Sequence, residues 1–134
     1  MGFKGQGRRG IYLCHGFCEL GATPLSEALD DLRDFLVSHP DDAVVIVHQD
    51  QVTPEDFVRA VRAAGLEEFV YRGPVDGDWP TLGKMVATNQ RLVILNENRA
   101  GAAPWNHLAY DGALQETPFA FTTVAQLNGS SKRD

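Results

Sequence analysis

Two continuously apolar runs constrain this chain more than any other feature, because neither alternates between polar and apolar residues. Ala43–Gln49 and Arg91–Asn96 each contain four consecutive branched aliphatic side chains. Such runs are typical of strands in a parallel sheet that is covered on both faces. Ile11–His15 and the short Phe69–Tyr71 are weaker strand patterns. The sequence therefore predicts four strands.

Helical patterns lie between the predicted strands. One apolar stripe at helical spacing runs over residues 25–36, a second over residues 57–64, and a third, shorter one over residues 82–86. The resulting order, βαβαβαβ, predicts an α/β fold with a parallel sheet and right-handed crossovers. In such sheets ligands bind at the carboxyl ends of the strands, so the polar residues that follow each strand are the candidates for a site.

Start and stop signals accompany these stripes. Thr23-Pro24 and Thr53-Pro54 each place a helix N-cap before a proline, whose missing N–H costs nothing at the first helical position. Thr81 is the expected start of the third helix, and Gly65 is the expected stop of the second. Each predicted helix thus begins at a threonine whose side chain can cap the first turn.

Length and charge set the domain organisation. The 134 residues suffice for one domain but fall far short of the roughly 250 of a (β/α)8 barrel. Residues 1–10 contain four glycines and carry a net charge of +3. Because the whole chain carries −6, the remaining residues carry −9. We predict a flexible basic arm over 1–10, an ordered domain over 11–127 and a flexible tail over 128–134.

The acidic balance excludes some function classes. A net charge of −6 argues against nonspecific nucleic-acid binding. No apolar run reaches the roughly 20 residues of a membrane span, and the first residues do not resemble a secretory signal. The segment Gly5–Gly10 matches the dinucleotide fingerprint G-x-G-x-x-G. It follows no strand and opens no helix, so we interpret it as part of the arm.

Cys14 and Cys18 flank His15 in a short segment. A disulfide and two free thiols are both open, depending on the redox compartment. A metal site is disfavoured, because no second Cys/His pair completes it. His15 itself ends a predicted strand and precedes Gly16, which allows close approach of a ligand. An imidazole there can act as a general acid or base, and a structural histidine is the alternative.

Polar residues also close the two strong strands. Gln49 and Asp50 follow the first, and Glu97 and Asn98 follow the second. By strand alternation, Gln49 shares one face with Val45 and Val47, whereas Asp50 shares the other with His48, and only one set can face a barrel interior. These side chains are candidates for binding a metal or a phosphate; solvated strand ends are the alternative.

Aromatic residues in predicted loops are candidates for lining a pocket. They include Trp79, Trp105 and Tyr110. Trp105 is kept as a substrate-binding candidate, with packing beneath a loop as the alternative.

Five segments, in their order along the chain, resemble those of a known protein family. The segments are Leu13–Gly16, Val44–Asp50, Trp79–Met85, Arg91–Ile94 and Glu116–Phe119. Together they resemble the phosphatidylinositol-specific phospholipase C X-domain superfamily, the PLC-like phosphodiesterases with a TIM-barrel fold. The resemblance covers about residues 11–121.

The resemblance implies a chemistry. The family cleaves phosphodiesters, in its phosphoinositide-cleaving members through a cyclic phosphate, with two histidines as acid and base. His15 matches the second histidine, which would protonate the leaving oxygen. Gln49 falls where calcium-dependent members carry a Glu ligand. Its amide oxygen can bind Ca2+ but brings no charge, so a Ca2+ cofactor and no metal cofactor are both open. The expected substrate is a phospholipid or small phosphodiester, with peripheral membrane contact. The family resemblance is compatible with a secreted or cell-surface location, which the sequence itself leaves open.

The chain also departs from the family pattern. The first catalytic histidine and the later barrel strands have no counterpart, and Lys84 stands where relatives carry an acid. We therefore expect a partial TIM barrel whose open sheet edges favour a homodimer. An inactive binding or interaction domain and a glycerophosphodiester phosphodiesterase are the alternative functions.

Overall fold

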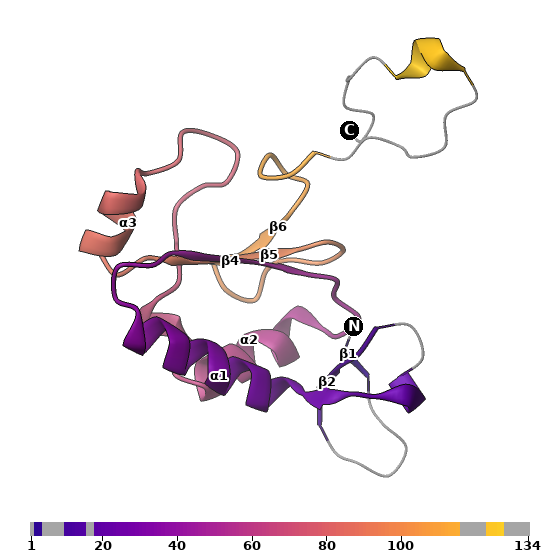
Figure 1. Ribbon diagram of the computed structural model, residues 1–134, viewed down its shortest axis with the longest axis vertical. Helices are drawn as coiled ribbons and strands as arrows, with labels where there is room; N and C mark the ends of the chain where they lie inside the picture. Colours follow the sequence, from indigo (N-terminus) through magenta and orange to yellow (C-terminus); the bar gives the residue numbers. More distant parts are fainter. Residues whose placement is uncertain (1, 4–9, 16–17, 116–122, 128–134) are drawn as a thin grey trace.

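The computed structural model describes residues 2–3, 10–15, 18–115 and 123–127. The chain forms a mixed α/β fold around a three-stranded parallel sheet (Figure 1). Helices α1 (Leu25–Ser38) and α2 (Pro54–Ala63) lie on one face of this sheet, and α3 (Leu82–Ala87) lies on the other. None of the described helices is long and apolar enough to cross a membrane.

The parallel sheet has the order β4–β5–β6, with β4 at Val44–His48, β5 at Leu92–Asn96 and β6 at Asn106–Leu108. Val44 pairs with Leu92, and His48 pairs with Asn96. All five residues of β5 are buried, as expected of a central strand. The two strong strand predictions are confirmed, whereas β6 was not predicted.

The order of the strands differs from that of a barrel. In a barrel each strand lies beside its successor, so residues 69–71 would lie between β4 and β5. Instead Val70 makes a single parallel bridge to Leu92, on the edge of β5 that faces away from β4. The crossover back to β5 then carries α3 across to the second face, because right-handed crossovers in opposite directions cover opposite faces. The parallel sheet is confirmed; the partial TIM barrel is not.

The predicted first strand also takes a different place. Within Ile11–His15 only Tyr12–Leu13 forms a strand, β2, which pairs antiparallel with β1 (Gly2–Phe3) and β3 (Thr23–Pro24). Ile11 and Leu13 pack against the core beside α1 and α2, and the Leu25 N–H donates to the Ile11 carbonyl at 2.8 Å. Apolar burial is satisfied there without pairing to β4, so the expectation of a parallel strand is wrong.

The helix boundaries follow the predicted caps in two of three cases. Thr53 and Thr81 accept hydrogen bonds from the backbone N–H groups of Asp56 and Lys84, both at 3.2 Å. Gly65 adopts φ +70° after the end of α2, as expected of a stop residue. The predicted Thr23 cap is wrong, because Thr23 belongs to β3 and Pro24 occupies the N-cap position of α1.

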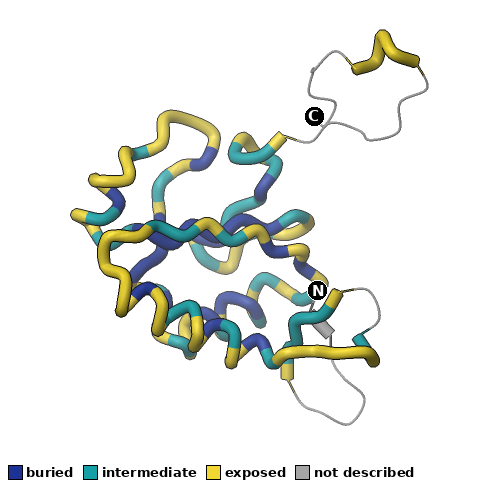
Figure 2. Tube along the Cα trace, viewed as in Figure 1, coloured by how far each residue is buried: buried dark blue, intermediate teal, exposed yellow. Residues whose placement is uncertain are grey.

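Strand β5 is buried along its whole length (Figure 2), and two apolar clusters cover its two faces. The first joins Leu92 and Ile94 to α1 and α2, and the second joins Val93 and Leu95 to α3 and the loops beside it. Strand β4 is an edge strand whose burial alternates, so it exposes Val45 by 59% and Val47 by 49%. The sheet is therefore covered on both faces at its centre and open along β4.

Three short 3-10 helices complete the described elements: η1 (Cys18–Leu20), η2 (Leu66–Glu68) and η3 (Val124–Gln126). Most of the predicted arm, including residues 4–9, lies outside the described residues. The predicted tail over 128–134 also lies outside them.

Candidate functional site

The carboxyl ends of β4 and β5 place Gln49 and Glu97 at one edge of the sheet. Gln49 is exposed, and by strand alternation it lies on the same open face as the exposed Val45 and Val47. The Glu97 N–H donates to the His48 carbonyl at 3.0 Å, which extends the β4–β5 ladder by one residue. The structure thus puts both predicted residues at the edge where ligands bind parallel sheets.

Asp50 lies on the opposite face and holds a loop. Its side chain is 3% exposed, and its Oδ1 accepts from the Asn98 N–H at 2.7 Å. The Asn98 side chain donates to the Asp50 carbonyl at 3.0 Å, and the Arg99 Nε lies 3.5 Å from Oδ2. These contacts tie the end of β4 to the loop after β5, so Asp50 and Asn98 come together in a positioning role.

Three neighbouring strands contribute a buried polar chain that the sequence analysis missed. The His48 Nδ1–H donates to Asn96 Oδ1 at 3.0 Å, Asn96 Nδ2 donates to Asn106 Oδ1 at 2.6 Å, and Asn106 Nδ2 donates to the Gly101 carbonyl at 2.9 Å. The sequence signal for this hydrogen-bonded chain was a polar residue at the end of each strand. It was missed because the sequence analysis did not predict β6, which carries Asn106. The chain joins all three strands near their carboxyl ends.

His48 is enclosed on its remaining sides. Its ring stacks on Phe57 of α2 with centroids 4.4 Å apart, and its Nε2 has no hydrogen-bond partner among the described residues. Burial lowers the pKa of His48, and this effect exceeds the opposing hydrogen bond to Asn96 and the charge of Asp50. A neutral, enclosed imidazole of this kind supports the sheet and is not accessible to substrate.

His15 is exposed and lies two residues beyond the end of β2. Cys14 and Cys18 form a disulfide across it, with Cα atoms 5.2 Å apart, so the structure selects the disulfide from the two open alternatives. No hydrogen bond or ion pair between described residues joins His15 to Gln49, Asp50 or Glu97. The imidazole is thus accessible, but it is carried by the antiparallel sheet and not by the parallel one.

Trp105 lies in the core and not in a pocket. Its side chain is 1% exposed, and its Nε1–H donates to Glu67 Oε1 at 3.0 Å. Hydrogen bonds from Arg62 and then Trp105 lower the pKa of the Glu67 carboxyl. The indole therefore has a packing role and offers no accessible face to a substrate.

The donor set at the sheet edge does not fit a calcium site. Among the residues that the structure describes, no group of three or more His, Cys, Asp or Glu side chains could hold a metal ion. Gln49 and Glu97 supply one neutral and one charged oxygen donor, and Asp50 is committed to Asn98 and Arg99. Calcium in proteins takes 6–8 oxygen ligands, so we derive no step through a metal.

The geometry defines an α/β protein with polar side chains at the carboxyl edge of a parallel sheet and an exposed histidine on a neighbouring antiparallel one. A family model for the PI-PLC X domain matches residues 4–128. The chain belongs to the PI-PLC X domain family.

Two relatives agree with this family. PI-PLC X domain-containing protein 1 of Arthroderma benhamiae is 29% identical over an alignment of 118 residues that covers 82% of this chain and 39% of the relative. A PI-PLC X domain-containing protein of Arabidopsis thaliana is 32% identical over an alignment of 115 residues that covers 73% of this chain and 27% of the relative. The chain thus spans well under half the length of these relatives. No solved structure matches it.

Proposed function

We propose that the chain is part of a phosphoric diester hydrolase that acts on a lipid head group, with His15 as its general acid. The observation that carries this proposal is the family match over residues 4–128, which includes the Leu13–Gly16 segment. The exposure of His15 supports it, because a proton donor must reach the leaving oxygen of a bound phosphodiester.

The proposed reaction requires His15 to protonate the leaving oxygen. Cleavage of a phosphodiester expels an alkoxide, which leaves poorly unless a positioned acid protonates it. A protonated imidazole gives up its N–H proton to that oxygen as the P–O bond breaks. The proposal assigns no base to the attacking hydroxyl, since of the other histidines His48 is buried, His39 lies beyond the end of α1, and the Nε2 of His107 on β6 lies 3.4 Å from the Tyr71 carbonyl.

Gln49 and Glu97 are the proposed contacts to the substrate. Both follow strands of the parallel sheet, and Gln49 is exposed there. An amide N–H donates to phosphate or hydroxyl oxygens, and a carboxylate accepts from hydroxyl groups. Asp50 contributes by holding the neighbouring loop, and Trp105 contributes through the core.

Hydrolysis by the wild-type chain and by matched histidine variants tests the proposal. We expect cleavage of phosphatidylinositol and bis-p-nitrophenyl phosphate to fall by about 100-fold or more in His15→Ala, the usual range for losing a general acid. His39→Ala is the control, because it removes another exposed imidazole at the opposite end of α1. We expect it to retain the wild-type rate.

The same assay separates the alternatives. Equal rates in the wild type and His15→Ala contradict a catalytic role for His15. Binding of lipid without cleavage by the wild type indicates an inactive binding domain. A preference for glycerophosphodiesters indicates the glycerophosphodiester phosphodiesterase alternative, and loss of activity in a calcium chelator indicates dependence on Ca2+.

A further inference from the structure

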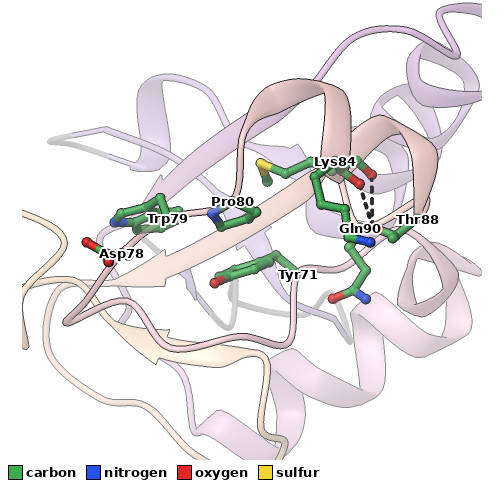
Figure 3. A pocket seen from close by; sticks show the side chains of 8 residues that line it. Tyr71, Asp78, Trp79, Pro80, Lys84, Thr88 and Gln90 are labelled. Atoms are coloured by element: carbon green, nitrogen blue, oxygen red, sulfur yellow. Dashed lines mark hydrogen bonds between the residues drawn. The ribbon is translucent and has the colours of Figure 1, made fainter.

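A pocket on the α3 face of the sheet lies outside the site described above. Its volume is about 340 Å³ (Figure 3). It is lined by Tyr71, Asp78, Trp79, Pro80, Lys84, Met85, Thr88 and Gln90. Tyr71 and Met85 belong to the cluster on the α3 face, whereas β2, which leads to His15, packs on the α1 and α2 side. The pocket is therefore separate from the proposed acid.

An aromatic pair forms one wall of this pocket. Tyr71 and Trp79 stack with ring centroids 5.4 Å apart and planes 23° from parallel. Tyr71 is held in place, because it is 5% exposed and its hydroxyl donates to the Pro74 carbonyl at 3.0 Å. Trp79 remains 41% exposed. The electron-rich face of an indole attracts cations, most strongly those with little hydration.

Two opposite charges lie at the two ends of the pocket. Asp78 is beside Trp79, and Lys84 is at the far end beside Gln90 (Figure 3). Neither charged side chain makes an ion pair or a side-chain hydrogen bond with any described residue. A ligand that complements both ends carries a cation toward Asp78 and an anion toward Lys84.

The Lys84 end of the pocket has hydrogen-bond donors that suit an anion. Lys84 supplies an ammonium group, and its backbone is fixed in α3 by the Thr81 cap. The Gln90 Oε1 accepts from the Arg72 N–H at 3.2 Å, which leaves the Gln90 amide nitrogen to donate. An ammonium and an amide N–H together suit the oxygens of a phosphate.

The opposite end favours a quaternary ammonium over a primary amine. Trp79, Pro80 and Met85 are apolar surroundings against which methyl groups pack, and Asp78 is the carboxylate near them. A primary ammonium would need three hydrogen-bond acceptors, which these side chains do not supply. Methyl groups and a diffuse positive charge match an aromatic wall with one carboxylate.

We propose that this pocket binds a phosphocholine group, with the quaternary ammonium against Trp79 and Asp78 and the phosphate on Lys84 and Gln90. The same group occurs on phosphatidylcholine at a membrane surface and as a free soluble molecule. Binding here is non-covalent and does not depend on cleavage at His15, so the two proposals stand or fall separately.

Indole N–H resonances provide a direct test. The chain has two tryptophans, one in the pocket and one, Trp105, buried with its N–H on Glu67. In a titration of the whole chain with phosphocholine, we expect the Trp79 resonance to shift with a Kd in the millimolar range while the Trp105 resonance stays in place. Trp79→Phe assigns the resonances and keeps an aromatic ring.

Variants at each end locate the charges. We expect Lys84→Gln to weaken binding of phosphocholine about fivefold and to leave binding of choline unchanged. We expect Asp78→Asn to weaken both, and Trp79→Ala to weaken both by about tenfold. Binding to Trp79→Ala is followed through the backbone amide resonances of the residues that line the pocket, because this variant lacks the indole resonance. The controls are Arg59→Gln, which removes an exposed positive charge on α2, and Phe35→Ala, which removes an aromatic ring that is 39% exposed.

Two further measurements distinguish a membrane source of phosphocholine from a soluble one. Sedimentation with phosphatidylcholine vesicles that is lost in Trp79→Ala supports a membrane head group, whereas binding of free phosphocholine alone supports a soluble ligand. A shift of the Trp79 resonance with inorganic phosphate as large as that with phosphocholine at equal ionic strength, or an affinity for phosphocholine that is unchanged in both Lys84→Gln and Asp78→Asn, overturns the proposal. Absence of any shift at the Trp79 resonance also overturns it.

Discussion

At the scale of single residues, His48 shows how burial decides the role of an imidazole. Its Nδ1–H begins a chain of hydrogen bonds through Asn96 and Asn106, while its Nε2 faces no partner in the described part of the chain. Protonation of Nε2 would place a charge against Phe57 and the apolar side of α2. The polar chain is therefore stable with a neutral His48.

The pH dependence of stability tests this role. Because burial lowers the pKa of folded His48 below 6.5, the unfolded chain binds more protons than the folded chain as the pH falls below 6.5. We expect the free energy of unfolding to decrease toward the folded pKa, by at most about 1.4 kcal/mol per pH unit. Urea unfolding at several pH values measures this slope.

Two variants separate His48 from the other titrating groups. His48→Gln keeps an amide donor for Asn96 and removes the imidazole, so its stability should vary less with pH than that of the wild type. His39→Gln, which removes an exposed imidazole, is the control. Identical slopes in the wild type and His48→Gln would show that His48 does not titrate as inferred.

At the scale of elements, Arg91 joins the end of α1 to the start of β5. Its guanidinium is buried, with the side chain 4% exposed, and donates to the carbonyls of Leu36, His39 and Asp42 at 2.6, 3.0 and 3.1 Å. The last carbonyls of a helix lack intrahelical partners, so a single buried cation satisfies them. The guanidinium also lies 5.2 Å from the centroid of the Phe69 ring.

Replacing this guanidinium should destabilise the fold. Lysine cannot reach three carbonyls with one planar fork, so Arg91→Lys leaves buried carbonyls unpaired. We expect the free energy of unfolding to fall by about 3 kcal/mol. Arg59→Lys is the control, since Arg59 makes an exposed pair with Asp56. Equal urea midpoints for the two variants would contradict the role assigned to Arg91.

At the scale of the whole molecule, the open edge of β4 is the feature that bears on association. β4 pairs with β5 on one side only within the described sheet, and it exposes Val45 and Val47 on one face. An edge strand with exposed apolar side chains is a template for pairing with another chain. The homodimer expected from the sequence stays a prediction, and β4 is the edge at which we place it.

We expect self-association of this chain to increase with concentration and to depend on β4. Val45→Lys places a charge beside the free edge and should reduce the apparent mass in light scattering at high concentration. Val37→Lys on α1 is the matched control, because Val37 is 55% exposed and lies on a helix, which offers no free strand edge for pairing. A monomer at all concentrations, or equal effects of both variants, would contradict pairing through β4.

Local sequence predicted several residues of the candidate site, but it did not predict which of their side chains are exposed and which are buried. Alternation placed Gln49 and His48 on opposite faces of β4, yet it did not say which face α2 would cover. The contact of His48 with Phe57 settles this, and it leaves Gln49 exposed. Trp105 was equally compatible with a pocket or the core until Glu67 was seen to accept its N–H.

The sequence by itself determined where β4, β5 and the three helices begin and end to within a few residues, because apolar periodicity, threonine caps and Gly65 act over one or two turns of chain. Only the tertiary structure decided that residues 69–71 lie beyond β5, that β2 pairs antiparallel, and that Trp105 is buried. Strand partners are chosen by burial between segments far apart in the sequence. An apolar run is equally suited to several such partners, so its own residues do not select one.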